Sequence, residues 1–170
     1  MTSASNLNIR LRPATISDLD LLEHWDRQPH VIACDPDESD WANELQRSED
    51  WLEQLIAELD GQPIGVIQII DPLEETSHYW GNVPPNLRAI DIWIGEAYNL
   101  NKGYGTIMMQ LALEKCFAPP EVSAVLIDPL ASNTKAHRFY ERLGFRFVEE
   151  RIFEGHACFV YELKRVWWMS

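Results

Sequence analysis

The sequence lacks any long apolar run. No apolar segment approaches the roughly 20 residues that a membrane-spanning helix requires. The first residues, MTSASNLNIR, contain no apolar stretch of the kind found in signal peptides. We therefore expect a soluble, cytoplasmic protein that has no membrane partner.

Cysteine and histidine are scarce as well. The three cysteines are Cys34, Cys116 and Cys158. Because their number is odd and they are widely separated, the sequence predicts neither a disulfide framework nor a zinc site. The histidines His24, His30 and His137 form no metal-ligand pattern, so we expect no bound metal and a local partner for each ring.

Basic residues are few, since 14 Lys and Arg stand against 27 Asp and Glu, for a net charge of −13. A nucleic-acid partner requires a basic footprint, so this excess of acid argues against one. An acidic surface can steer a small cationic substrate toward its site. It can equally serve solubility alone, so the charge by itself does not choose between these two readings.

The composition that is present suits one globular domain. The 170 residues are 46% hydrophobic and 11% aromatic, which is enough for one packed core. No repeat or linker divides the chain, so we expect a single domain over residues 1–170.

The order of the expected elements predicts a mixed α/β fold. Alternation of apolar and polar residues predicts strands at 7–13, 51–59, 62–71, 88–96, 122–127, 145–153 and 156–164. Capping residues and helical spacing predict helices from Ser17 to Trp25, over about 39–46, over 105–117 and from Asn133 to Gly144. The turn-rich stretches 29–40 and 71–88 are expected to be loops, and Asp60 with Gly61 to form a hairpin turn.

In the fourth expected strand, Ile92 and Ile94 share one face while Asp91 and Trp93 share the other. An acidic side chain on the inward face of a strand is uncommon unless it has a bonding partner or a function. Asp91 is therefore either a functional group or a structural one that is bonded to Arg88 or to backbone.

A glycine-containing loop, NKGYGT, follows this strand and leads directly into the helix expected over 105–117. Gly103 and Gly105 allow close approach to the backbone, and the helix start offers unpaired N–H groups to a pyrophosphate. The spacing matches neither a P-loop nor a dinucleotide fingerprint. Downstream, Asn133, Ala136 and Tyr140 lie on one face of a helix that ends at Gly144.

These two segments together resemble the GNAT acetyltransferase superfamily. Its coenzyme A loop, R/Q-x-x-G-x-G/A, matches Gly103 and Gly105, and its next helix reads N-x-x-A-x-x-x-Y-x-x-x-G-F, as does Asn133 to Phe145. The resemblance implies a mostly antiparallel sheet splayed around an acetyl-coenzyme A site, with helices on its flanks. It assigns cofactor contacts to Ile92, Trp93, Ile94, Leu100, Asn101, Lys102, Gly103, Tyr104, Gly105, Thr106, Asn133 and Tyr140.

The chain departs from that pattern at Leu100, which stands where the family has Arg or Gln. A leucine cannot donate a hydrogen bond to phosphate, so phosphate binding would rest on backbone amides and on Lys102. Asn133 would be a helix cap, a contact to the pantetheine arm, or both.

A closer resemblance, to the aminoglycoside 6′-N-acetyltransferases and related siderophore-pathway acetyltransferases, extends over residues 18–31, 61–68, 88–95 and 128–145. It implies acetyl transfer to a primary amine of a small polycationic acceptor. The corresponding substrate-site residues are Asp91, Asp128, Glu154, Trp80 and Asp35. Ala33, Cys34 and Asp35 stand where relatives often carry a tryptophan pair, which leaves the exact substrate open.

Each assignment has a chemical reason and an alternative. A primary amine with a pKa of about 8–10 is protonated at neutral pH and must lose a proton to attack, which gives Asp91 a catalytic role. Tyr140 would protonate the leaving thiolate or simply pack in the core. Asp128 could be a turn residue and Glu154 a hairpin residue, and Trp80 with Tyr79 would either wall the substrate or cover a sheet edge.

Other functions stay open at this point. The acceptor could be a siderophore-precursor hydroxylamine or a lysine-type amine, or the protein could be a coenzyme A sensor that has lost catalysis. A nucleic-acid or ribosomal-protein partner is disfavoured by the charge. The apolar tail at 166–170 would pack on the domain or on a partner chain, and a monomer and a homodimer are both compatible with the sequence.

Overall fold

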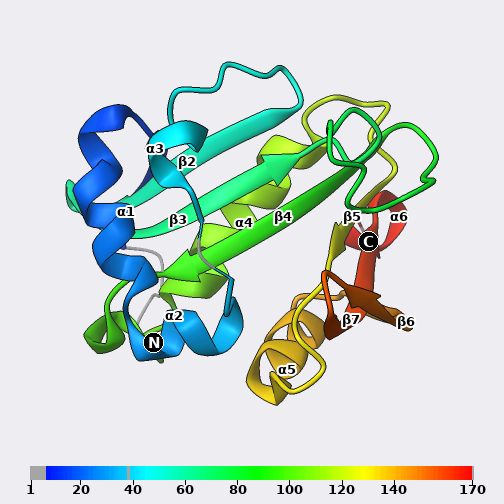
Figure 1. The fold of residues 1–170 in the computed structure, drawn as a ribbon. Coiled ribbons are helices and arrows are strands. Elements are labelled where there is room, and N and C mark those ends of the chain that lie inside the picture. Colours follow the sequence, from blue (N-terminus) through cyan, green and yellow to red (C-terminus); the bar gives the residue numbers. More distant parts are fainter. Residues whose placement is uncertain (1–6, 38, 170) are drawn as a thin grey trace.

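The computed structural model describes residues 7–37 and 39–169 (Figure 1). The expectation about the start of the chain falls mainly on residues 1–6, which lie outside the described residues, as do Glu38 and Ser170. Within the described part of the chain, no helix is long and apolar enough to cross a membrane.

Seven strands form one sheet in the order β1-β2-β3-β4-β5-β7-β6. They are β1 (Ile9–Pro13), β2 (Leu52–Leu59), β3 (Gln62–Ile70), β4 (Leu87–Ile94), β5 (Ala124–Ile127), β6 (Arg146–Phe153) and β7 (His156–Lys164). Neighbours are antiparallel except β4 and β5, which are parallel. The mixed α/β fold is thus confirmed, and the turn at Asp60 and Gly61 joins β2 to β3 with both residues at positive φ.

Helices cover both faces of this sheet (Figure 1). They are α1 (Leu19–Asp26), α2 (Pro29–Cys34), α3 (Trp41–Glu44), α4 (Tyr104–Phe117), α5 (Thr134–Arg142) and α6 (Arg165–Trp168), with 3-10 turns at Ile16–Asp18 and Ala97–Asn99. The first face holds α1 and α3, whose side chains pack with Ile56, Val66 and Trp93. The opposite face holds α4 and the aromatic side of α5.

Two local predictions were wrong. Ser17 does not cap the first helix, because Thr15 precedes a 3-10 turn there and forms a capping box with Asp18. The stretch 29–40 is not entirely a loop, since α2 occupies its first half. Pro29 suits the first helical turn, and Val31 is buried, so tertiary packing holds this short helix.

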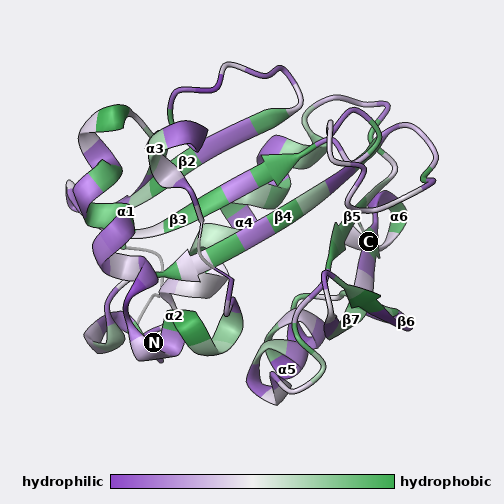
Figure 2. Cartoon of the chain, in the orientation of Figure 1, coloured by the Kyte–Doolittle hydropathy of each residue, from purple (hydrophilic) through white to green (hydrophobic). Residues whose placement is uncertain are grey.

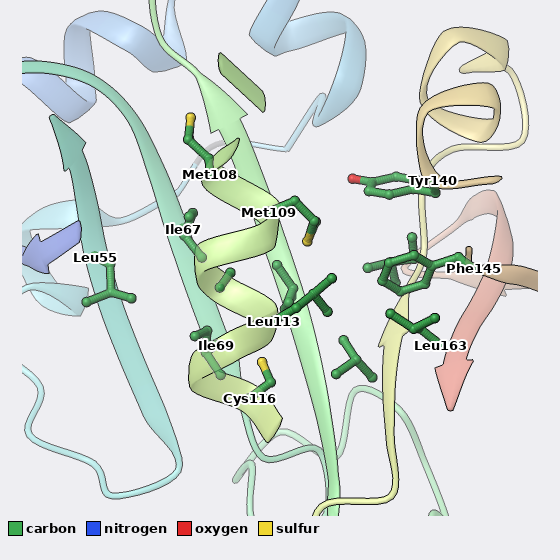
Figure 3. Close-up of a cluster of buried hydrophobic side chains, with 14 of the residues drawn as sticks. Leu55, Ile67, Ile69, Met108, Met109, Leu113, Cys116, Tyr140, Phe145 and Leu163 are labelled. Carbon is green, nitrogen blue, oxygen red and sulfur yellow. The ribbon is translucent and has the colours of Figure 1, made fainter. Parts of the chain in front are cut away.

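The main core lies between the sheet and α4 (Figure 3). Met108, Met109 and Leu113 of α4 face β3, which carries Ile67, and its neighbouring strands. The side chains of these three residues and of Ile67 are almost fully buried. Hydropathic colouring shows the same division, with apolar segments in the strands and in α4 and polar ones in the outer loops (Figure 2). This core fixes α4 against β4 and so positions the start of α4.

The described part of the tail packs on the domain. The ring of Trp168 stacks on Phe117 at a centroid distance of 4.9 Å, and the Arg146 guanidinium lies 3.9 Å from the centroid of Trp167. Arg165 donates to the carbonyl oxygens of Phe117, Pro119 and Val122 at 2.8–3.0 Å. These contacts tie α6 to the end of α4.

Candidate active site

The central feature of the site is the point where β4 and β5 part. The two strands pair only from Leu87 with Ala124 to Ala89 with Leu126. β4 then continues to Ile94, whereas β5 ends at Ile127. A cleft of about 1070 Å³ opens beyond this point and is lined by residues from both halves of the sheet. The splayed sheet predicted from the resemblance is therefore present.

The free edge of β4 faces this cleft. The Trp93 carbonyl oxygen lies against the position that a Cβ of Gly65 would take, so it points toward β3. Alternation along the strand turns the peptide groups of Ile92 and Ile94 to the other side. One of their acceptors is used already, since His30 of α2 bonds to the Ile94 carbonyl oxygen at 2.8 Å.

The side chain of Trp93 packs on the sheet face that carries α1 and α3. Its ring lies edge-on to Trp41 at a centroid distance of 6.5 Å, on the face that carries α1 and α3. Although Trp93 lines the cleft, its side chain lies on the same sheet face as Asp91 and away from α4.

The start of α4 has the form expected for anion binding. Gly103 takes the N-cap position with φ 83°, a left-handed conformation that glycine adopts without strain, and no side chain caps the helix. Its first N–H groups are therefore available to a ligand. Leu100, Asn101, Gly103, Gly105 and Thr106 line the cleft, whereas Lys102 and Tyr104 are not among its lining residues.

α5 approaches the cleft from the other side. Asn133 caps this helix by accepting a hydrogen bond from the Ala136 amide, and its side-chain nitrogen lies 3.4 Å from Cys34 Sγ. Tyr140 is buried between Phe139 and Phe145, and its hydroxyl points from α5 toward β4 (Figure 3). That hydroxyl has no hydrogen-bond partner among the described residues, and burial raises its pKa, so it remains a neutral phenol.

A row of cations on α5 was not identified from the sequence. Lys135, Arg138 and Arg142 line the cleft, and all three are exposed. Their spacing of three and four residues places them on one helix face, a signal that the sequence contains. Within the described residues none of them forms an ion pair, so they are available to an anionic ligand.

Asp91 and Asp128 meet where the strands part. Each stands two residues beyond the pair formed by Ala89 and Leu126, so both project from the same sheet face. Burial raises the pKa of Asp91 well above its usual range, with a further contribution from the charge of Asp128. Burial likewise raises the pKa of Asp128 to about 6.

The structural alternative for Asp91 is not observed. Arg88 donates to the Leu87 carbonyl oxygen and lies 3.5 Å from Asp71, not beside Asp91. Among the described residues the Asp91 carboxylate has no hydrogen-bond partner, although its backbone pairs with Gln68 of β3. Asp128, by contrast, accepts a hydrogen bond from the Tyr79 hydroxyl at 2.5 Å.

More carboxylates surround this pair. Those that line the cleft besides Asp91 and Asp128 are Asp35, Asp37, Asp40, Glu44, Glu75 and Glu154. Of these, the sequence identified only Asp35 and Glu154. Burial raises the pKa of Asp35, and it also raises the pKa of Glu44, which accepts a hydrogen bond from Gln68 at 3.1 Å. This side of the cleft is thus rich in acidic side chains.

Trp80 supports the wall of the cleft more than it forms its surface. Only 4% of Trp80 is exposed, and its ring packs edge-on against Phe153 at 5.1 Å. Tyr79 is half-buried and stacks on the same Phe153 ring at 4.6 Å. The alternative in which Trp80 covers the sheet therefore fits its burial, and Tyr79 is the ring with a polar group in the cleft.

The histidines have local partners, as expected. His24 lies 3.0 Å from Glu96, and His137 bonds to the Leu130 carbonyl oxygen at 2.9 Å. In the segments that the structure describes, no three side chains of the metal-binding types are grouped to hold an ion.

A further histidine contact crosses the cleft, since His156 in β7 lies 3.3 Å from Asp37 in the segment after α2.

Comparison with known proteins places this site in a family. The family model described as "Acetyltransferase (GNAT) domain" matches residues 15–153 of this chain. Aminoglycoside N(6′)-acetyltransferase type 1 of Klebsiella pneumoniae is 31% identical over 157 residues, which cover 83% of this chain and 75% of that protein. Lysine N-acyltransferase MbtK of Mycobacterium tuberculosis is 26% identical over 168 residues, which cover 91% of this chain and 76% of that protein.

A solved structure extends the similarity to three dimensions. Aminoglycoside acetyltransferase AAC(6′)-Ib, in complex with coenzyme A and kanamycin, superimposes with a TM-score of 0.84 at 27% sequence identity. The match covers 95% of this chain and 97% of that one. The fold and the splayed site are therefore shared with an enzyme whose structure contains both a cofactor and an aminoglycoside.

Proposed function

The chain belongs to the GNAT acetyltransferase family, and on that premise we propose that it transfers the acetyl group of acetyl-coenzyme A to the 6′-amine of an aminoglycoside. The observation that carries the choice of acceptor is the wall of carboxylates at the parting of β4 and β5. Among the described residues, eight acidic side chains line one cleft, and its arginines and lysine all come from α5. A polycationic sugar fits such a wall.

Acetyl-coenzyme A supplies the activated thioester. The residues placed to hold it are the first N–H groups of α4 after Gly103, the free edge of β4 at Ile92 and Ile94, and Asn133 on α5. Leu100 offers no donor to the phosphates, and the cations of α5 take that role. Arg138 and Arg142 supply positive charge from α5 in place of the family side chain at the position of Leu100.

The acceptor binds from the opposite face of the sheet. Asp91 and Asp128 project from the face opposite α4 and Tyr140, so amine and thioester meet only where the strands part. The ammonium of the acceptor binds between the two carboxylates, and its charge lowers the pKa of both. Asp35 and Glu154 extend this anionic surface to further ammonium groups.

The chemistry requires two proton movements. The bound ammonium loses one proton to the carboxylate pair, and the free amine then attacks the thioester carbon. As the C–S bond breaks, the neutral phenol of Tyr140 protonates the sulfur, and the second proton that the nitrogen loses restores the phenol. The products are an acetamide and a free thiol, and no covalent enzyme intermediate forms.

Release of free thiol provides the test. The purified chain is incubated with acetyl-coenzyme A and with each of four acceptors in turn. These are kanamycin, an aminoglycoside analogue with a hydroxyl group in place of the 6′-amine, lysine, and N6-hydroxylysine. We expect turnover of kanamycin and much slower turnover of the analogue that lacks the 6′-amine. No turnover of any aminoglycoside, together with turnover of lysine or its hydroxylamine, would assign the chain to the lysine-type acceptors of its 26%-identical relative. Binding of acetyl-coenzyme A without thiol release on any amine would indicate a sensor.

A further inference from the structure

Tyr79 joins two parts of the chain that are 49 residues apart. It lies in the long loop between β3 and β4, and its hydroxyl donates to Asp128 Oδ2 at 2.5 Å. The Tyr79 phenol also has its pKa raised, first by burial and then by the charge of Asp128. Tyr79 therefore stays protonated and can act only as a donor to this carboxylate.

The ring of Tyr79 is held in place by a rigid aromatic group. It stacks on Phe153 with an interplanar angle of 11° and lies edge-on to Trp80. Arg151 covers the Phe153 ring at 4.7 Å from its centroid and donates to the Trp80 carbonyl oxygen at 3.1 Å. A hydroxyl on a ring so fixed has little freedom to leave Asp128.

This contact makes the two aspartates unequal. Asp128 has one carboxylate oxygen bonded to a neutral donor, whereas the Asp91 carboxylate has no hydrogen-bond partner among residues 7–37 and 39–169. A donor that favours the charged form keeps a carboxylate ionised at a lower pH. The other titratable groups around Asp128 are Asp91 on β4, Asp35 after α2, Glu154 between β6 and β7, Cys158 on β7 and Tyr140 on α5. All of them are acids. The Tyr79 hydroxyl, followed by a backbone N–H at Asp128 itself, counters their effect on the Asp128 carboxylate.

We propose that Tyr79 is a positioning residue that divides the work between the two aspartates. By donating to Asp128 it keeps that carboxylate ionised and oriented as the anchor of the acceptor's ammonium, and it leaves Asp91 free to take the proton. This inference rests on the proposed acetyl transfer to a protonated amine. In the balanced step, Asp91 gains one proton from the ammonium, the nitrogen forms the C–N bond as the C–S bond breaks, and the second proton that the nitrogen loses passes by way of Tyr140 to the departing sulfur.

The variant Tyr79→Phe removes the hydroxyl and retains the ring that stacks on Phe153. We expect KM for kanamycin to rise about tenfold with KM for acetyl-coenzyme A unchanged, because a hydrogen bond to a charged group is worth roughly one power of ten or more. The acidic limb of the kcat/KM profile should move to higher pH by about one unit. A purely structural role would not move that limb.

A matched control is available in Tyr161. Its hydroxyl donates to Glu141 at 3.1 Å, outside the cleft, so Tyr161→Phe deletes a bond of the same kind without touching the site. In an Asp128→Asn background, Tyr79→Phe should have no further effect on KM or on the pH profile. Full additivity of the two changes, or a Tyr79→Phe profile that coincides with the wild type, would overturn the proposal.

One readout is independent of the acceptor. The carboxyl carbon of Asp128, labelled with 13C and followed by NMR, should titrate about one pH unit higher in Tyr79→Phe than in the wild type. If no aminoglycoside is a substrate but this shift is present, the proposed function fails while the Tyr79–Asp128 coupling holds. If kanamycin is turned over and the shift is absent, the division of roles between the aspartates is wrong.

Discussion

Asp91 on β4 and Asp128 directly after β5 each stand two residues past the last pair of the parallel ladder, Ala89 with Leu126. Pairing of β4 and β5 brings their backbones together, and the end of pairing opens the cleft directly beside them. Two carboxylates are thus concentrated at the place where both faces of the sheet are accessible to ligands. Two buried carboxylates side by side destabilise the fold when both are charged, and they can bind a cationic substrate.

Replacement of Asp91 by asparagine tests its catalytic role. The variant retains the shape of the side chain but cannot accept the ammonium proton, so we expect kcat with kanamycin to fall by about 10²–10⁴-fold. KM for acetyl-coenzyme A should not change. Asp20→Asn, an exposed change in the first turn of α1, serves as the control. Equal kcat values for wild type and Asp91→Asn would remove Asp91 from the proton transfer.

The same substitution should stabilise the protein. Burial holds the pKa of Asp91 above its value in the unfolded chain, so between these two values the folded state binds more protons and stability falls as pH rises. Asparagine carries no charge and escapes this loss. We expect Asp91→Asn to raise Tm at pH 8 by about 2–4 °C, the change that roughly 1 kcal/mol produces at this size. The gain should shrink as the pH falls toward about 3, where the unfolded chain is protonated at this position as well. A gain that is constant with pH would show that the charge of Asp91 is not its cause.

Much of the fold was predictable because its signals are local. The turn at Asp60 and Gly61 and the helix that Asn133 caps are specified by a few adjacent residues. The residue spacings around Gly103 and Tyr140 predicted a cofactor site, and the structure brings both residues to one cleft. In contrast, α2 has no such signal, because its six residues depend on the buried Val31 and on the bond from His30 to β4.

The acceptor side of the cleft was only partly predictable. Asp91 and Asp128 were identified through the resemblance, but Glu44 and Glu75 come from segments whose path across the sheet is set by packing. The spacing of residues in the sequence does not predict that these segments lie beside β4. The bond between Tyr79 and Asp128 is a long-range contact of the same kind, and the sequence indicated only the ring of Tyr79, not the partner of its hydroxyl.

The cations of α5 should determine affinity for the cofactor. We expect Arg138→Ala to raise KM for acetyl-coenzyme A about tenfold, the effect of losing one charge-assisted hydrogen bond of roughly 1.5 kcal/mol. KM for kanamycin should stay constant. Arg10→Ala is a suitable control, since Arg10 is exposed on the far edge strand β1, where its side chain bonds to Asn8. An unchanged KM in both Arg138→Ala and Arg142→Ala would remove these two arginines from phosphate binding.

Arg165 should contribute to stability and not to catalysis. Its three hydrogen bonds to the carbonyl oxygens of Phe117, Pro119 and Val122 close the end of α4 onto the tail. Removing them in Arg165→Ala leaves these acceptors short of donors, and we expect a loss of about 2–4 kcal/mol of unfolding free energy in urea. Arg146→Ala removes the cation–π contact with Trp167 and should cost about 1 kcal/mol or less. Equal losses in the two variants would show that the rings of α6, and not the Arg165 bonds, hold the tail in place.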